Sequence, residues 1–432
     1  MGSLSQQEMQ FNKPILFLLL SGLCAQLHAQ DLIYPKKIVK KLCSHRFAGR
    51  GYIDNGAVKA GKFIAKEMKK IGLEPFTKDY LQPYSFPVNT IEKCYIEFRS
   101  ENKKKTRLLE GRDYLVGSGT QTIQQKIALS AIPVLNAAVL SDSLSWLSIT
   151  KQSGNWVLLD TLPAETIKKQ REKLNWLYTH CHVVEFSNAK LTWDVSTQTN
   201  PYCRITLTGR LRHFLASKEI EVEIKSRLIK PTQYNVLGFV AGNRRPDSFL
   251  VVCAHYDHLG KMGKAVFPGA NDNAAGVAMM LDLADYYKKN PHPYTILFIA
   301  FSGEEAGLEG SFHFVRSNRN LLSRMRFVLN LDLVGTGETG MTVVNATVFN
   351  KEFALLDSLN KKGSYLPEIR KRGKAANSDH YAFTELGVPS FFCYLSGPRT
   401  AYHDIEDIPK TLFLKGYRST WFLFQNFLNS LP

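Results

Sequence analysis

The C-terminal half of the chain alternates near-continuous apolar runs with segments of helical spacing. The apolar runs are short and rich in β-branched residues, which is typical of strands buried on both faces. We expect strands at 234–240, 249–254, 295–301, 327–333, 341–345 and 390–394. Helices are expected at 274–287, 308–316, 351–359, 382–385 and 412–428. This alternation predicts an α/β fold with a mixed, largely parallel sheet flanked by helices.

The first part and the middle of the chain carry different patterns. Residues 31–75 predict two helices joined by a Gly-punctuated loop, and the second helix, at 58–71, ends at Gly72. A strand is expected at 90–99. From 111 to 229, one polar helix at 164–177 interrupts short β-like segments at 126–129, 156–159, 183–186, 203–207 and 220–224. We therefore expect a β-rich domain at 111–229, inserted into a discontinuous domain formed by 30–110 and 230–432.

Residues 1–29 have the pattern of a cleavable export signal. Lys13 precedes the apolar run 14–20, and Ala29 supplies a small residue at the cleavage position. The run is too short to span a bilayer as a stable helix. We expect cleavage near Ala29, a periplasmic or secreted mature protein, and no stable membrane span. A lipoprotein anchor at Cys24 is disfavoured because Leu23 stands where a small residue normally precedes the lipidated cysteine.

The composition limits the size of the domains and the classes of function, but it does not identify a function. The chain has 432 residues, of which 44% are hydrophobic and 22% charged, so it suits one large or two medium globular domains. The net charge is +17, but the basic residues form only short scattered clusters, which favours a solvated surface over nucleic-acid binding. No C-x-x-C pair suggests a sulfur-bound zinc. Cys253 and Cys393 are expected as buried thiols, and a Cys181–Cys203 disulfide stays open.

Histidine and acidic side chains lie near the ends of several expected strands. They are His255 and Asp257, Asp272, Glu304 and Glu305, Asp332, and His403 with its neighbour Tyr402. In an open α/β sheet, ligands bind outside the carboxyl ends of the strands. Imidazoles and carboxylates without thiolates suit zinc or another borderline divalent metal.

Paired metals would give this set a hydrolytic chemistry. Two ions about 3.5–4 Å apart clamp both sides of a hydrolytic transition state. They need a bridging carboxylate, and the reaction also needs an unbound carboxylate that accepts a proton from water. Glu304 and Glu305 can divide these roles, because neighbouring residues at a strand end point in different directions.

Five motifs resemble a known family. They are HxD at 255–257, GANDNAAG at 269–276, SGEEAGLEGS at 302–311, NLDLVG at 330–335 and YHDIEDIPKTL at 402–412. In this order, over 232–432, they resemble the co-catalytic zinc aminopeptidases of the aminopeptidase Y type, the family that includes glutamate carboxypeptidase. The FAGRGY loop at 47–52 resembles the family's N-terminal portion. Residues 220–242 resemble the junction between a protease-associated insertion and a zinc-exopeptidase (phosphorylase/hydrolase-like) catalytic sheet.

The resemblance implies two Zn²⁺ ions per chain and a role for each site residue. His255, Asp272 and Asp332 match the ligands of the first zinc, and Asp272, Glu305 and His403 match those of the second. Asp272 therefore bridges. The remaining matches are Glu304 as general base, Tyr402 as oxyanion donor, Asp257 as the support of His255, and Asn273 as the partner of Asp272 in a cis peptide bond. Ser378, Asp379 and His380 are expected as pocket wall, and His258, His292 and His313 as structural histidines.

The implied function is an exported zinc exopeptidase, above all an aminopeptidase, that hydrolyses peptides with a dizinc-bridging water activated by Glu304. Two alternatives stay open. One is a glutaminyl cyclase, which shares the fold, uses one zinc and commonly has Trp where this chain has Tyr402. The other is a non-catalytic binding protein of that fold. Substrate preference, the terminus that is trimmed, oligomeric state and the role of the insertion are left open.

Overall fold

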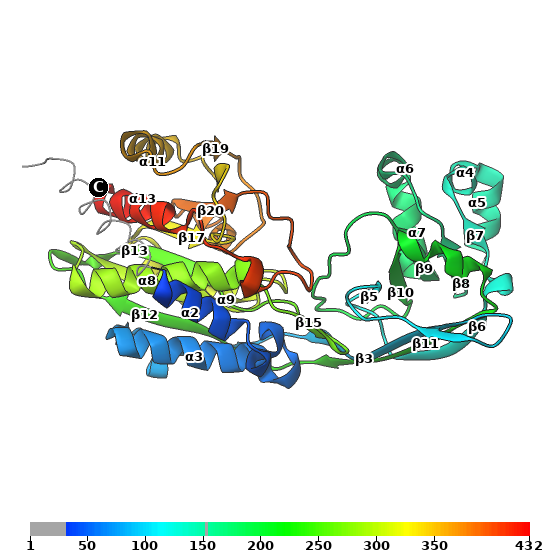
Figure 1. Cartoon of the computed structure of the whole chain (residues 1–432). Coiled ribbons are helices and arrows are strands. Elements are labelled where there is room, and N and C mark those ends of the chain that lie inside the picture. Colours follow the sequence, from blue (N-terminus) through cyan, green and yellow to red (C-terminus); the bar gives the residue numbers. More distant parts are fainter. Residues whose placement is uncertain (1–31, 152–153) are drawn as a thin grey trace, which may run out of the picture.

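The computed structural model describes residues 32–151 and 154–432, so the expected export signal at 1–29 lies outside the described residues. Within those ranges, no helix has the length and apolar character needed to cross a membrane. The strands of the described ranges form sheets of nine, six and five strands. Figure 1 shows the nine-stranded sheet with its helices at one end of the molecule and the five-stranded sheet at the other.

The nine-stranded sheet is the expected mixed α/β sheet. Its strands run in the order β1 (Glu74–Pro75), β12 (Thr232–Val240), β16 (Tyr294–Phe301), β13 (Arg245–His255), β17 (Met325–Leu331), β20 (Ser390–Ser396), β18 (Gly340–Val344) and β19 (Ile369–Lys371). The remaining strand, β2 (Leu81–Ser85), pairs with β12. The four central strands, β16 to β20, are parallel, while β12 and β18 join them antiparallel. All six strands expected in the C-terminal half therefore form.

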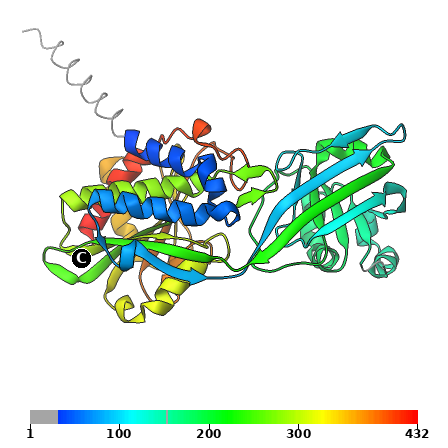
Figure 2. The same cartoon turned by 90° about the horizontal axis from the view of Figure 1, so that it is seen from below.

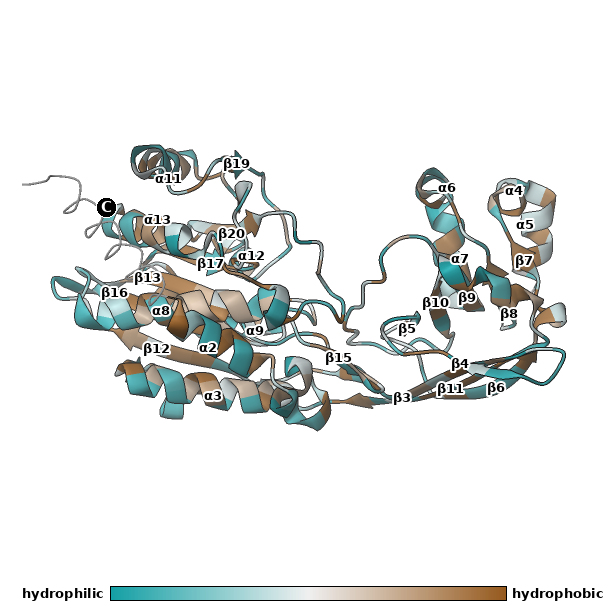
Figure 3. Cartoon of the chain, viewed as in Figure 1, coloured by the Kyte–Doolittle hydropathy of each residue, from teal (hydrophilic) through white to brown (hydrophobic). Residues whose placement is uncertain are grey.

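Helices cover both faces of this sheet, which explains its uninterrupted apolar runs. Along β13, Leu250 and Val252 pack in one core with α2 (Ile33–Leu42), α3 (Gly56–Ile71), α8 (Ala275–Lys289), α11 (Asn350–Gly363) and α13 (Tyr417–Ser430). The alternate residues Val251 and Cys253 face a second core with α9 (Glu309–Ser317) and α12 (His380–Thr384), near the short helix α10 (Arg319–Leu322). Figure 3 shows the hydrophobic colour concentrated in the central strands.

A smaller unit continues from the main sheet through two long paired strands, β3 (Val88–Arg99) and β11 (Glu219–Ile229), seen side by side in Figure 2. They belong to the six-stranded sheet, with β6 (Ile123–Ala128), β14 (Gly260–Met262), β15 (Ala265–Phe267) and β4 (Lys105–Arg107). This sheet takes strands from before residue 111 and after residue 229, so it crosses both expected boundaries. The division of the chain at these boundaries stays a prediction.

The five-stranded sheet carries more helix than the sequence pattern suggested. Its order is β5 (Tyr114–Val116), β10 (Arg204–Thr208), β9 (His182–Ser187), β8 (Trp156–Leu159) and β7 (Val134–Leu135). The expected helix at 164–177 is two helices, α6 (Ala164–Lys169) and α7 (Arg171–His180). Helices α4 (Ala137–Ser141) and α5 (Ser143–Thr150) were not expected. Their signal lay in the N-caps, since Asn136 and Asp142 accept main-chain bonds from Val139 and Ser145.

The buried cysteines are thiols. Cys253 and Cys393, which lie in β13 and β20, are free and buried as expected. Cys203 is also free, so the disulfide with Cys181 left open by the sequence is not formed.

Candidate metal centre

The carboxyl ends of three neighbouring parallel strands bring most of the candidate residues together. His255 is the last residue of β13, Glu304 and Glu305 follow β16, and Asp332 follows β17. Because β13 lies between β16 and β17, their ends form one edge. Asp272, before α8, and His403, from the C-terminal loop, complete the cluster.

Asp272 lies between the two imidazoles. Its Oδ1 is 3.4 Å from Nε2 of His255, and its Oδ2 is 3.1 Å from Nε2 of His403. A second carboxylate approaches each ring: Asp332 Oδ2 is 3.4 Å from His255 Nε2, and Glu305 Oε2 is 3.3 Å from His403 Nε2. The cluster therefore contains two nitrogen–oxygen donor sets that share one carboxylate.

The donor set fits divalent cations. His255 and Asp332 lie within 4.8 Å of Glu304, and His255 and Asp272 lie within 4.8 Å of Glu305, counting one ligand atom from each residue. Within the described ranges, Oδ1 of Asp332 is buried without a hydrogen-bond partner. Several buried carboxylates at this separation repel one another unless cations compensate their charge.

The adjacent glutamates have pKa values displaced in opposite directions. Burial, and then the neighbouring carboxylates of Glu305, Asp379 and Asp332, raise the pKa of Glu304 well above its usual value. Burial and the Asp272 carboxylate also raise the pKa of Glu305. The charge of His403 and a hydrogen bond from His258 outweigh them and lower this pKa to about 2. Such a split is typical of one carboxylate that accepts protons and one that stays ionised.

Asp257 contacts the site differently from the expected support of His255. Nδ1 of His255 is 3.2 Å from the main-chain oxygen of Asp257 and 3.8 Å from its carboxylate Oδ1. The carboxylate instead accepts hydrogen bonds from the Tyr52 hydroxyl at 3.0 Å and from the Glu304 main-chain N–H at 3.3 Å. Asp257 therefore fixes both the His255 ring and the start of the Glu304 turn.

The loop that carries Asp272 is held from two sides. The Asp272–Asn273 peptide bond is cis. The Asn273 amide donates to the main-chain oxygen of Leu331 at 2.9 Å, at the end of β17. The buried Asp407 carboxylate accepts from the main-chain N–H groups of Asn271 and Asp272, each at 3.0 Å. The position of Asp272 thus depends on the sheet and on the C-terminal loop.

Arg50 is a site-supporting residue that the sequence reasoning missed. It is fully buried, and its guanidinium donates to the main-chain oxygens of Tyr256 at 2.8 Å, Pro268 at 2.5 Å, Gly269 at 2.8 Å and Asp272 at 3.0 Å. These carbonyls belong to the two loops that carry His255 and Asp272. The available signal was an arginine within the Gly-punctuated loop at 47–52.

His258 also lies in the cluster, although it was expected to be structural. Its Nδ1 is 2.7 Å from Glu305 Oε1 and 3.8 Å from Asp272 Oδ1. The ring is fully buried, and its Nε2 finds no hydrogen-bond partner in the described part of the chain. The two histidines therefore contact different oxygens of Glu305: His258 contacts Oε1, and His403 Nε2 contacts Oε2.

Two further candidates lie beside the cluster. The Tyr402 ring stacks on His403 with centroids 4.0 Å apart, and 44% of the residue is exposed. Ser378 donates to Asp332 Oδ2 at 3.3 Å, so the expected pocket wall touches a candidate ligand. Asp379 is fully buried, and this burial raises its pKa to about 7.

Residues 235–424 match the model of Peptidase family M28. "Aminopeptidase YwaD" of Bacillus subtilis is 31% identical over 200 residues, which cover 44% of this chain and 42% of that relative. A "Probable zinc metalloprotease" of Pyricularia oryzae is 34% identical over 166 residues, or 34% of this chain and 33% of that relative. The chain thus spans less than half the length of these curated relatives.

Solved structures are similar over nearly the whole chain. BSAP, a zinc aminopeptidase from Bacillus subtilis, has a TM-score of 0.66 at 20% identity, covering 91% of this chain and 93% of that one. A peptidase M28 precursor from Shewanella amazonensis has a TM-score of 0.66 at 14% identity, covering 94% and 95%. At these identities the likeness establishes the fold, and its coverage extends into the smaller unit.

Proposed function

We propose, from the match of residues 235–424 to the model of Peptidase family M28, that the chain is a zinc-dependent exopeptidase, an aminopeptidase, with two metal sites. His255, Asp272 and Asp332 hold one ion, and Asp272, Glu305 and His403 hold the other. The names of two relatives, an aminopeptidase and a probable zinc metalloprotease, support both the metal and the reaction class.

The observation that carries the proposal is the double contact of Asp272. Its two oxygens face different imidazoles at 3.4 and 3.1 Å, as expected of a carboxylate that bridges two cations. A hydrogen-bonded structural aspartate would need only one of these histidines. The second carboxylate beside each ring completes two similar donor sets.

Zinc held by these residues would lower the pKa of a bound water and polarise the scissile carbonyl. Glu304 accepts the proton of the attacking water on its carboxylate and passes it to the leaving amine. Burial and the neighbouring carboxylates raise the pKa of Glu304, which favours its uptake of a proton from water. The Tyr402 hydroxyl donates a hydrogen bond to the oxyanion that develops on the attacked carbonyl.

Hydrolysis of aminoacyl anilides before and after chelation tests the proposal. We expect activity on substrates with a free α-amine, loss of activity after chelation, and recovery with Zn²⁺. Blocking the α-amine of the same anilide should abolish hydrolysis, which separates an aminopeptidase from other exopeptidases. Full activity in the metal-free protein would overturn the proposal.

The same preparation distinguishes the glutaminyl cyclase alternative. That activity would convert an N-terminal glutamine peptide to its pyroglutamyl form with one zinc per chain. The paired donor sets around Asp272 support the peptidase instead. A non-catalytic protein of this fold would bind peptides without hydrolysis or cyclisation.

A further inference from the structure

A short segment of the smaller unit clasps the loop that carries His403. We call this segment, residues 190–194, the strap. The Trp193 main-chain N–H donates to the main-chain oxygen of His403 at 2.9 Å. In return, the Trp193 main-chain oxygen lies 3.1 Å from Nδ1 of the His403 ring. A segment about 210 positions away in sequence therefore contacts both the backbone and the side chain of a candidate ligand.

The ring contact determines which nitrogen of His403 can bind metal. Nε2 faces Asp272 and Glu305, so it is the nitrogen that must be unprotonated in the ligating form. The ring proton is then on Nδ1, where it is donated to the Trp193 carbonyl. A hydrogen bond of this kind fixes the tautomer and the orientation of a metal-binding imidazole.

Lys190 adds a second attachment at the other end of the strap. Its ammonium donates to the main-chain oxygens of Thr400 and, at 3.0 Å, Tyr402, and it forms an ion pair with Asp404. These three residues surround His403 in sequence. The Lys190 side chain is 39% exposed, so its contribution comes from these directed contacts rather than from burial.

The strap is itself anchored by the Trp193 indole. Nε1 donates to the Val116 main-chain oxygen at 2.8 Å, and the ring stacks on Phe267 with centroids 4.9 Å apart. Trp193 is only 6% exposed. The side chain therefore determines where the main-chain carbonyl lies.

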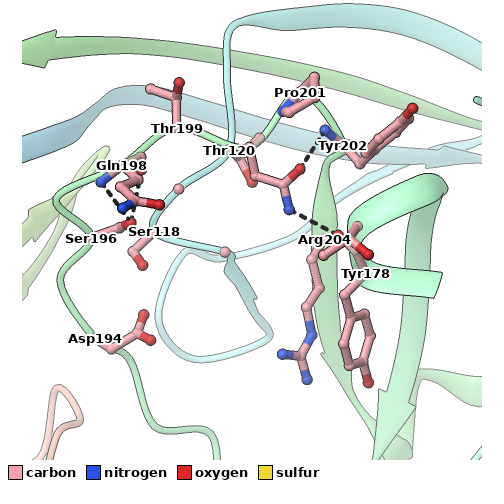
Figure 4. Close-up of a pocket in the computed structure, with 14 residues that line it drawn as sticks. Ser118, Thr120, Tyr178, Asp194, Ser196, Gln198, Thr199, Pro201, Tyr202 and Arg204 are labelled. Carbon is pink, nitrogen blue, oxygen red and sulfur yellow. Dashed lines mark hydrogen bonds between the residues drawn. The ribbon is translucent and has the colours of Figure 1, made fainter. Parts of the chain in front are cut away.

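Two cavities lie beside the strap. One cavity, of about 350 Å³, is lined by Lys190, Trp193 and His403. Another cavity, of about 540 Å³, is lined in part by Asp194, at the end of the strap, and by Arg204. Figure 4 shows these two side chains at its border.

We propose that the strap is part of the second metal site, with Trp193 and Lys190 as positioning residues that hold His403 in its ligating orientation. This inference rests on the proposed role of His403 as a zinc ligand. It gives the smaller unit a function in the metal centre, since it supplies the hydrogen-bond acceptor of the His403 ring. Loss of such a partner typically lowers metal affinity by about 10–100-fold.

Metal titration of variants tests the strap. The metal-free protein is titrated with Zn²⁺ against a chromophoric chelator, and with Co²⁺ while its visible absorption is recorded. We expect Trp193→Ala and Lys190→Met to weaken one of two binding events by about 10–100-fold and to change the Co²⁺ spectrum of that site only. Trp193→Phe keeps the stacking but loses the N–H, so it should weaken the site less than Trp193→Ala.

Matched controls lie in the same unit. Trp156 is similarly buried in the same core, and its Nε1 donates to Gln125, away from the strap. Lys173 donates to the Leu140 main-chain oxygen within the smaller unit. Trp156→Ala and Lys173→Met should keep both affinities.

Three results would overturn the inference in distinguishable ways. Equal Zn²⁺ affinities and Co²⁺ spectra in wild type, Trp193→Ala and Lys190→Met would reject the strap alone. An equal loss in the control variants would show that general destabilisation, not His403, is responsible. A wild-type protein without a second Zn²⁺ site would reject the proposed function together with the strap.

Discussion

Asp272 Oδ2 lies 3.1 Å from Nε2 of His403, although the two residues are 403 − 272 = 131 positions apart in the sequence. The other oxygen of the same carboxylate faces His255 at 3.4 Å. One side chain therefore links a strand-end residue to the C-terminal loop. The roles proposed for the surrounding residues follow from this link.

Replacing Glu304 with Gln should abolish turnover and leave the metals in place. The amide keeps the shape of the side chain but cannot accept the proton of water, and general bases contribute about 10²–10⁴-fold. We expect a fall of that size in kcat, with unchanged zinc content by elemental analysis. Unchanged turnover would remove Glu304 as the base, and loss of zinc would instead make it a ligand.

Tyr402→Phe should separate stacking from hydrogen bonding. The phenyl ring can still stack on His403, so we expect little loss of stability. Burial, followed by the carboxylates of Asp272 and Glu305, raises the pKa of Tyr402, so its hydroxyl stays protonated and able to donate at neutral pH. We expect kcat to fall about 10²–10³-fold with a smaller change in KM. A kcat equal to that of wild type would exclude the oxyanion role.

Arg50→Met should destabilise the fold and the site together. It removes the guanidinium donor from four main-chain oxygens, three of them in buried contacts, and a buried oxygen left without a donor costs about 1–3 kcal/mol. We expect the free energy of unfolding in urea to fall by on the order of 4 kcal/mol, and Arg50→Lys should rescue it only in part, because an ammonium lacks the planar fork of donors. Arg46→Met, at an exposed position nearby, should stay within about 0.5 kcal/mol of wild type. Equal effects of the two methionine variants would contradict the assignment.

His258→Phe tests whether this histidine positions Glu305. The ring volume is kept, but the 2.7 Å contact with Glu305 Oε1 is lost. We expect about 10–100-fold weaker binding of one Zn²⁺, with partial recovery in His258→Gln, which can still donate. His292→Phe serves as the control, since His292 is buried and accepts from the Tyr294 main chain, outside the cluster. Unchanged Zn²⁺ affinity in His258→Phe would make His258 structural, as the sequence first suggested.

The main sheet was predictable because burial on both faces leaves a simple signature. Leu250 and Val252 face one core, and Val251 and Cys253 face the other, so β13 reads as an unbroken apolar run. The same logic placed Asp332 and Glu305 at strand ends. The order and register of the strands bring these residues to one edge of the sheet. The order of the motifs along the sequence does not determine this arrangement.

The supporting contacts were not predictable from pattern. Arg50 uses main-chain oxygens as partners, and any residue type supplies such an oxygen. Trp193 reaches His403 through its own main-chain atoms, so nothing in the sequence around either residue marks the pair. His258 passed for a structural histidine because its contact with Glu305 depends on how two loops fold. The candidate ligands have side-chain types that the sequence displays directly, whereas the contacts of Arg50, Trp193 and His258 depend on how distant loops fold.

The most direct test of the paired metal site is a Zn²⁺ titration of the metal-free protein, with bound metal and aminoacyl-anilide hydrolysis measured on the same samples. The shared carboxylate of Asp272 predicts two tightly bound Zn²⁺ per chain and full activity only when both are present. Asp272→Asn should weaken both binding events together. Full activity at a single bound Zn²⁺, or in the metal-free protein, would contradict the paired site.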